Sequence, residues 1–184
     1  LFTSGSTGPP KGVVYTHEMF SRQIEVIRDC YQIQQHDVDL STFPLFSLFS
    51  VGIGMTSILP EMDFTRPARV NSEKILRTIS KYKVTSGFGS PALWDTITRY
   101  CISNNKSLYS LNRILMAGAP IPGSLLKNFD QLLKPNAKIH TPYGATEALP
   151  VTTIERKEIS EDTFKKSQQG HGTCVGKAVP GIEF

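Results

Sequence analysis

The sequence has little cysteine, and its cysteines are arranged neither for cross-linking nor for metal binding. There are three, at positions 30, 101 and 174, so the count is odd and the spacings are wide. Small secreted domains held by disulfides have many closely patterned cysteines, and zinc sites have closely spaced pairs. The pattern therefore disfavours both classes and predicts a reduced, cytoplasmic protein.

A dense run of positive charge is also missing. Lys and Arg number 20 against 16 Asp and Glu, which gives a net charge of +4, but the basic residues are scattered. Nucleic-acid-binding domains usually carry a basic stripe, so we expect no nucleic-acid partner. A modest positive balance favours small anionic ligands such as nucleotides. Composition leaves the oligomeric state open.

One stretch lacks charge altogether and is long enough to span a bilayer, from Leu40 to Pro60. It contains Pro44, two glycines and several hydroxyl residues, which are typical of turns and capped helices in a folded core. We interpret the stretch as a strand, a turn and a buried helix, and expect no transmembrane segment.

Strand-like and helix-like runs alternate along the chain. Strands are predicted at 12–17, 37–44, 84–89, 111–120 (ending in a turn) and 137–144, and helices at 17–31, 51–59, 71–83, 91–102 and 123–133. The polar tail 155–171 is predicted to be a surface loop or an irregular strand pair. This alternation predicts an α/β fold, a mostly parallel sheet with helices on both faces.

Three glycine-containing turns follow predicted strands: GSPA after residue 88, AGAP after residue 116 and YGATE after residue 142. Ligands of α/β sheets bind at the carboxyl ends of the strands. We therefore expect these turns to converge on one crevice.

The opening loop, LFTSGSTGPPKG, has the chemistry of a phosphate site. Its glycines allow backbone N–H groups to approach an anion, its hydroxyls add donors, and Lys11 adds positive charge. Its spacing differs from the common P-loop, G-x-x-x-x-G-K-[ST]. From composition alone, a flexible linker remains an alternative.

The order of residues in this loop is specific. TSGSTGPPKG at 3–12 resembles the signature phosphate loop of the adenylate-forming (AMP-binding) superfamily. AGAP at 117–120, YGATE at 143–147 and VGKAVPGIE at 175–183 resemble further motifs of that superfamily, in the same order. The resemblance covers essentially the whole chain and identifies it as part of the large N-terminal adenylation domain.

The resemblance implies that ATP and Mg²⁺ bind here. Catalytic roles would fall to Lys11, Thr146 and Glu147, and the metal would be held by Glu147 and Thr7. The nucleotide would meet Tyr143, Gly144, Thr146 and the turn at Gly118, Ala119 and Pro120. Tyr143 would stack on adenine, which this turn would border, and Thr146 would hydrogen-bond the α-phosphate. The β- and γ-phosphates would be held by the loop residues Thr3, Ser4, Gly5, Ser6, Thr7, Gly8 and Lys11.

The resemblance also implies a reaction. A small carboxylic acid would attack ATP, giving acyl-AMP and pyrophosphate, and coenzyme A could then accept the acyl group. The acyl pocket would include Phe46, Ser47, Gly89 and Trp94, with Ser47 standing where many members have histidine. The segments 42–55, 58–68, 88–95 and 140–151 resemble one branch, the bacterial olefin-biosynthesis synthetases that convert a β-hydroxy acid into a β-lactone.

The same resemblance predicts that residues 1–184 are a partial AMP-binding domain without the small C-terminal domain, which carries the family's catalytic lysine. We therefore expect the isolated chain to be inactive. The alternative interpretation is a nucleotide- or phosphate-binding module that performs no chemistry.

Overall fold

The computed structural model describes residues 9, 11–159 and 161–183. Within them a seven-stranded sheet has the order β2-β1-β3-β4-β5-β6-β7. Its strands are β1 (Val38–Ser41), β2 (Thr56–Ile58), β3 (Ser86–Gly89), β4 (Arg113–Met116), β5 (Lys138–Ala145), β6 (Ala148–Glu155) and β7 (Lys177–Ala178). The first five strands are parallel, while β6 and β7 are antiparallel to their neighbours. The predicted mostly parallel sheet is confirmed.

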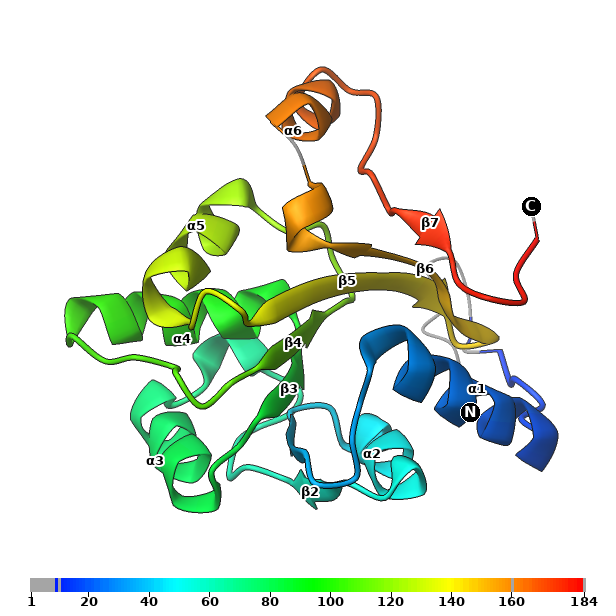
Figure 1. Ribbon diagram of the computed structural model, residues 1–184, viewed down its shortest axis with the longest axis horizontal. Helices are drawn as coiled ribbons and strands as arrows, with labels where there is room; N and C mark the ends of the chain where they lie inside the picture. The colour runs from blue at the N-terminus through cyan, green and yellow to red at the C-terminus, as the bar shows by residue number, and fades with distance from the viewer. Residues whose placement is uncertain (1–8, 10, 160, 184) are drawn as a thin grey trace.

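Helices cover both faces of this sheet (Figure 1). They are α1 (His17–Tyr31), α2 (Ser47–Ile53), α3 (Ser72–Tyr82), α4 (Pro91–Ser103), α5 (Gly123–Leu132) and α6 (Glu161–Gln168), with short 3-10 turns η1 (Pro44–Phe46), η2 (Pro67–Arg69) and η3 (Arg156–Glu158). Helices α3, α4 and α5 pack on one face around the fully buried Trp94. Helices α1 and α2 form a smaller core on the other face.

Strand alternation explains how one sheet serves two cores. On β4, Ile114 and Met116 belong to the large core, whereas Leu115 between them packs against the small one. Side chains of successive strand residues point to opposite faces. The large core also takes Leu40 from β1 and Ile139 from β5.

Side-chain caps fix the starts of three helices. Thr16, Asn71 and Ser90 each accept a hydrogen bond from a backbone N–H in the first turn of α1, α3 and α4. Such caps satisfy donors that have no partner inside the helix. The predicted starts of these helices are confirmed. Tyr82 lies on the same helical face as Ile75 and Ile79, which predicts that it points inward, but it is 44% exposed because it is the last residue of α3.

Three sequence predictions of local structure are wrong. Residues 12–17 form only an isolated bridge at Gly12 before α1 begins. The helix predicted over 51–59 starts earlier and ends at Ile53, because Gly54 adopts a left-handed conformation (φ 93°). Residues 56–58 then pair with β1 as strand β2. The polar tail holds the helix α6 rather than only a loop or a strand pair.

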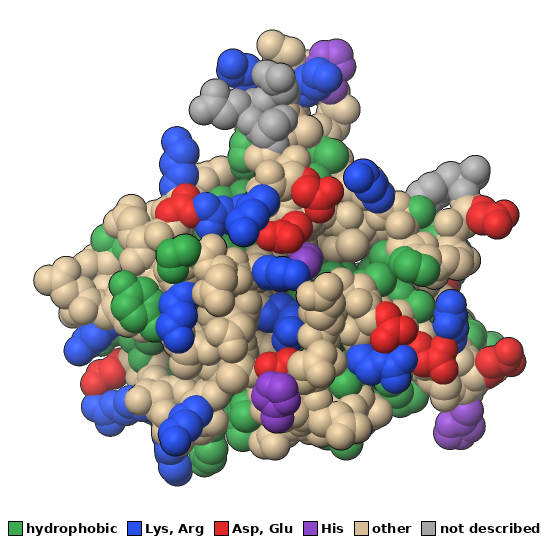
Figure 2. Space-filling view, in the orientation of Figure 1, with side chains coloured by type: hydrophobic (Ala, Val, Ile, Leu, Met, Phe, Trp, Pro, Cys, Tyr) green, Lys and Arg blue, Asp and Glu red, His purple; other side chains and the backbone are tan. Residues whose placement is uncertain are grey.

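The uncharged stretch 40–60 contributes β1, η1, α2 and β2 to the folded sheet layer, as we interpreted it. No helix in the described part of the chain combines the length and apolar character needed to cross a bilayer. On the face shown in Figure 2, Lys and Arg side chains are interspersed with acidic ones rather than gathered in one stripe.

Arg113 fastens the end of α1 to the sheet. Its Nε donates to the Tyr31 carbonyl at 2.8 Å and its Nη2 to the Gln32 carbonyl at 3.1 Å. Its Nη1 forms an ion pair with Asp37 at 3.0 Å, and both side chains are nearly buried. A positive charge at a helix C-terminus also interacts favourably with the helix dipole. One side chain therefore joins α1, the segment that leads into β1, and β4.

Two glycines offer a matched test of how β7 is held. Gly170 and Gly176 have similar left-handed φ values of 86° and 84°, but a Cβ at Gly170 would lie in open space, while one at Gly176 would collide with the Thr153 carbonyl of β6. We expect Gly170→Ala to cost about 1–2 kcal/mol of unfolding free energy, the cost of a left-handed alanine. Gly176→Ala should cost at least twice as much in denaturant unfolding. Equal losses would show that β7 does not need the close approach.

Candidate active site

The carboxyl ends of the parallel strands meet at a change in strand direction across the sheet. From β1 the chain passes through α2 to β2 on one side, and then returns through α3 to β3 on the other side of β1. In open α/β sheets the crevice outside such a switch point is the usual ligand site. The turns at 89–92, 117–120 and 143–147, predicted to converge on one crevice, lie at or follow the carboxyl ends of parallel strands. None of their residues lines the cavity described next.

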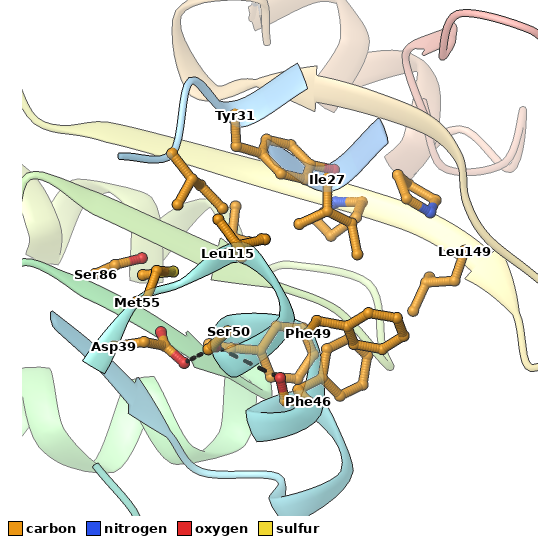
Figure 3. Close-up of a pocket in the computed structure, with 15 residues that line it drawn as sticks. Ile27, Tyr31, Asp39, Phe46, Phe49, Ser50, Met55, Ser86, Leu115 and Leu149 are labelled. Carbon is orange, nitrogen blue, oxygen red and sulfur yellow. Dashed lines mark hydrogen bonds between the residues drawn. The ribbon is translucent and has the colours of Figure 1, made fainter. Parts of the chain in front are cut away.

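A cavity opens beside this switch point, between the sheet, α1 and α2 (Figure 3). Its empty space, part of it open to solvent, is about 510 Å³. The lining is mostly apolar and consists of Ile27, Tyr31, Ile33, Asp39, Phe46, Phe49, Ser50, Ile53, Met55, Ser86, Phe88, Leu115, Pro142, Leu149 and Pro150. We call it the apolar pocket. Its lining, mostly apolar with a few polar side chains, is of the kind that holds the aliphatic or aromatic parts of small molecules.

Aromatic side chains form one wall of the apolar pocket. The ring of Phe46 stacks on that of Phe88 from β3, with centroids 3.9 Å apart and planes 11° from parallel. Phe49 from α2 packs against Phe46 at 5.6 Å. These contacts set the position of α2 over the sheet, and therefore the width of the pocket.

The four residues predicted for the acyl pocket are not all brought together. Phe46 lines the apolar pocket. Ser47 donates its hydroxyl to the Pro44 carbonyl at 2.6 Å, which closes the turn before α2. Gly89 is buried at the end of β3, where an added Cβ would meet Leu93, Trp94 and Thr42. Trp94 packs against Phe129 in the large core, so it lies behind the sheet, because α4 covers the opposite face.

The predicted nucleotide residues lie on a tight hairpin between β5 and β6. Tyr143 is 58% exposed on β5, and Thr146 and Glu147 form the turn itself. Gly144 is required there, since a Cβ would lie 2.5 Å from the Ala148 carbonyl oxygen. An exposed aromatic ring offers a face on which a base can stack. Leu149 and Pro150 of the same hairpin line the apolar pocket, and we call this side of the pocket its mouth.

The turn after β4 lies at the same edge of the sheet as this hairpin. The register pairs Leu115 with His140 on parallel strands, so residues 117–120 and Tyr143 both lie beyond this pair toward the carboxyl ends of the strands. Gly118 has a φ of 94°, and Gly118, Ala119 and Pro120 are exposed. The predicted adenine turn and the predicted stacking residue therefore lie at the same edge of the sheet.

The predicted phosphate loop lies almost wholly outside the described residues. This applies to Thr3, Ser4, Gly5, Ser6, Thr7 and Gly8, while Lys11 is described and exposed. Of the two predicted metal ligands, only Glu147 is therefore placed. The described residues hold no group of three or more His, Cys, Asp or Glu suited to a metal ion. Mg²⁺ in nucleotide sites needs only one or two carboxylates because the phosphates and water complete its coordination, so the residues present fit that ion.

Sequence reasoning missed Asp39, a carboxylate in the wall of the apolar pocket. Its Oδ2 accepts hydrogen bonds from the Ser41 hydroxyl at 2.5 Å and the Ser50 hydroxyl at 2.8 Å. Burial raises the pKa of Asp39, and the two hydroxyl hydrogen bonds oppose that rise. The signal was the alternation D-V-D-L-S in a strand, which puts two carboxylates and a serine on one face.

His140 on β5 is buried close to this site but does not line the pocket. Its ring lies 5.0 Å from that of Tyr31, and its Nε2 has no hydrogen-bond partner within the described structure. Burial, together with the positive charges of Lys138 and Arg113, lowers the pKa of His140 to about 4. It is therefore neutral at physiological pH and acts as a packing residue.

Comparison with known proteins places the whole chain. A sequence model described as "AMP-binding enzyme" matches residues 1–184. The chain is 43% identical to an olefin beta-lactone synthetase of Stenotrophomonas maltophilia, over 97% of the chain and 32% of that protein. It is 44% identical to a protein of the same name from Xanthomonas campestris, over 97% of the chain and 31% of that protein. The chain spans about one third of the length of these relatives.

Solved structures support the fold. O-succinylbenzoate coenzyme A synthetase of Bacillus subtilis, in complex with ATP and magnesium, matches with a TM-score of 0.72 at 24% identity, over 98% of this chain and 35% of that one. A nonribosomal peptide synthetase matches with a TM-score of 0.75 at 18% identity, over 88% of this chain and 17% of that one. At these identities the likeness is one of fold alone.

Proposed function

Because the chain belongs to the family of AMP-binding enzymes, we propose that it is the central part of an ATP-dependent ligase that activates a carboxylic acid as its acyl adenylate. The observation that carries the proposal is an apolar pocket lined in part by Leu149 and Pro150, which follow the Tyr143–Glu147 segment on the same hairpin. An acid lying in that pocket would present its carboxylate at the hairpin, where the α-phosphate of a nucleotide stacked on Tyr143 would lie.

In the proposed reaction, a carboxylate oxygen attacks the α-phosphorus of ATP. A new P–O bond forms, the bond to the bridging oxygen of the β-phosphate breaks, and pyrophosphate leaves with both electrons of that bond. Thr146 would donate to the α-phosphate, Glu147 would hold Mg²⁺, and Lys11 with the loop residues 3–8 would bind the leaving phosphates. The bound ion would supply charge stabilisation. The chain's contribution is positioning and fixed donors, which account for most catalysis in phosphoryl-type transfers.

The pocket lining indicates the substrate class. Its wall is built from aromatic and branched aliphatic side chains, with Phe46 and Phe49 from the α2 side and Ile27 from α1. Such a lining favours a long aliphatic acid over a short or charged one, since burial of alkyl groups contributes about 0.8 kcal/mol per CH₂. The relatives named olefin beta-lactone synthetases support a 3-hydroxy acid as the form used.

Two fates of the acyl adenylate compete. The substrate's own 3-hydroxyl oxygen can attack the acyl carbon, closing a β-lactone and releasing AMP, or the thiol of coenzyme A can attack and give a thioester. Internal attack gains from proximity, and a dry pocket protects the adenylate from water. We propose that attack by the substrate's own hydroxyl prevails over attack by coenzyme A. We also propose that the enzyme is cytoplasmic.

Product analysis tests this proposal. A full-length protein containing this chain is given a long-chain 3-hydroxy acid, ATP and Mg²⁺, with and without coenzyme A. We expect β-lactone, AMP and pyrophosphate in the absence of coenzyme A. Acyl-CoA as the sole product would place the protein among the thioester-forming ligases. No pyrophosphate with any acid would favour the alternative, a nucleotide-binding module without chemistry.

A further inference from the structure

The apolar pocket has a polar inner end. Apart from the Tyr31 hydroxyl, which is directed to Thr153 Oγ1 at 3.3 Å, the polar side chains of the lining are Asp39, Ser50 and Ser86. The register pairs Asp39 with Ser86 on neighbouring strands, and Ser50 donates to Asp39. In Figure 3 these three side chains gather on one side of the pocket, and Leu149 of the hairpin lies on the other.

Asp39 differs from the nearby carboxylate Asp37 in the partners that its carboxyl group has. Asp37 is paired with Arg113. Asp39 has no ion pair within the described residues, and its two hydrogen bonds both reach Oδ2, from Ser41 and Ser50. Ser41 in turn contacts the Ser57 hydroxyl of β2 at 2.9 Å. The carboxyl is thus held in one orientation by β1 and α2, with 5% of the residue exposed.

The inner end lies far from the mouth. Asp39 pairs with Ser86, Ser86 with Arg113, and Arg113 with Lys138, which precedes Tyr143 by five residues. At about 3.3 Å per strand residue, Asp39 lies roughly 16 Å along the strands from the hairpin. A group close to the reacting carboxylate cannot reach it from the mouth when the chain is extended. The far end of a long acyl chain can.

We propose that Asp39 determines which chain end the apolar pocket accepts: it excludes a methyl end that reaches it and binds a hydroxyl end. This inference rests on the proposed function, because it takes the pocket as the acyl site. The proposed selection applies only to aliphatic acids that are long enough for their far end to reach Asp39.

The physical reason is desolvation. A carboxyl group with only two serine hydroxyls as partners still needs further hydrogen-bonding groups around it. An alkyl end in contact with the carboxyl group offers none and leaves it incompletely hydrogen-bonded, which costs free energy. A hydroxyl end supplies a hydrogen bond in their place. Sites that contain a buried hydrogen-bonding group discriminate strongly against ligands that leave it unpaired, whereas apolar walls discriminate weakly between similar ligands.

The test uses a full-length protein containing this chain and pairs of straight-chain acids of increasing length. Each pair consists of a methyl-ended acid and its ω-hydroxy counterpart of the same length. Two readouts are taken: kcat/KM for pyrophosphate release, and the dissociation constant of the acid by calorimetry. At the length that reaches Asp39, we expect the ω-hydroxy acid to be favoured about tenfold in both. Shorter pairs should favour the methyl end, since their hydroxyl meets only apolar wall.

Asp39→Val removes the carboxyl and keeps a branched side chain of similar size. This variant should lose the hydroxyl preference and accept methyl-ended acids beyond the wild-type limit with about tenfold better kcat/KM. Asp39→Asn, which retains the shape and hydrogen-bonding capacity needed for folding, should reduce the preference. Ser41→Ala is the matched control: it removes one bond to Oδ2 from a residue that does not line the pocket, and should keep the preference.

The two proposals fail in different ways. If calorimetry shows the hydroxyl preference, and Asp39→Val removes it, while no acid gives pyrophosphate, the role of Asp39 stands and the proposed reaction is wrong. If pyrophosphate is released, but kcat/KM of the wild type varies with acid length in the same way for methyl-ended and ω-hydroxy acids, the proposed role of Asp39 is wrong. A preference that persists in Asp39→Val and Asp39→Asn also overturns it.

Discussion

Glu147→Ala and Lys11→Ala are each expected to lower ATP–pyrophosphate exchange at least about tenfold in a full-length protein that contains this chain, equivalent to roughly 1.4 kcal/mol of barrier. Glu147 stands in the exposed turn between β5 and β6, where a carboxylate can reach a metal bound to phosphate. Lys11 follows the glycine-rich loop and would meet the charge that develops on the leaving pyrophosphate. Radiolabelled pyrophosphate exchange measures this step directly.

The matched controls are an exposed acid and an exposed base away from the mouth of the pocket. Glu25→Ala on α1 and Lys106→Ala after α4 change the same charges at exposed positions. Both should keep exchange within about twofold of the wild type. Wild-type exchange in both Glu147→Ala and Lys11→Ala would refute the assignment of these residues to metal and phosphate.

Arg113→Ala is expected to lower the free energy of unfolding by about 3–5 kcal/mol, the range for removal of one partner from a buried ion pair. The change leaves Asp37 without its cation and leaves two carbonyl groups at the end of α1 without their donor. The control is Arg99→Ala, which breaks the exposed ion pair with Asp95 on α4. Exposed pairs contribute about 0–1 kcal/mol, so denaturant titration should separate the two variants clearly.

The pH dependence of unfolding provides a second readout of the same change. Burial by itself would raise the pKa of Asp37, but hydrogen bonds from Gln34 N–H, Thr85 and Arg113 outweigh it and lower that pKa. A lowered native pKa means that Asp37 stabilises the fold at neutral pH and that this contribution is lost as the pH falls through its native pKa. In Arg113→Ala the loss should begin at higher pH. An unchanged acid limb would contradict the ion pair's role.

Most strands of the parallel sheet and the helices between them could be predicted because their sequence patterns are local. Ser90 followed by Pro91 marks the start of α4, and the spacing of Leu125, Leu126 and Phe129 marks the buried face of α5. The failures occurred where tertiary pairing decides. Residues 56–58 form β2 only because β1 lies beside them. Strand β6 contains Pro150 and follows a turn, so its local pattern is that of a loop.

In the candidate site too, residues in a local motif could be predicted, whereas residues placed by tertiary packing could not. The nucleotide residues could be predicted because Tyr143 and Glu147 belong to one contiguous motif, and their role remains a prediction from resemblance. Asp39 was not found because its importance depends on the face of β1 that the pocket occupies. Trp94 was assigned to the acyl pocket from the family resemblance, but α4 turns it to the opposite side of the sheet. Residues close in sequence at the end of a strand can therefore lie on opposite faces of the sheet.

The unequal size of the two cores has a consequence for motion. Among the residues that the structure describes, nineteen buried ones form the core under α3, α4 and α5, whereas six form the core under α1 and α2. The second layer therefore exposes far less buried surface when it detaches. Local opening costs less free energy where less apolar area is exposed. Amide hydrogens of α1 and α2 are therefore set to exchange with solvent before those of α4 and β4. The pocket wall can adjust to ligands of different shape while the sheet beneath it stays closed.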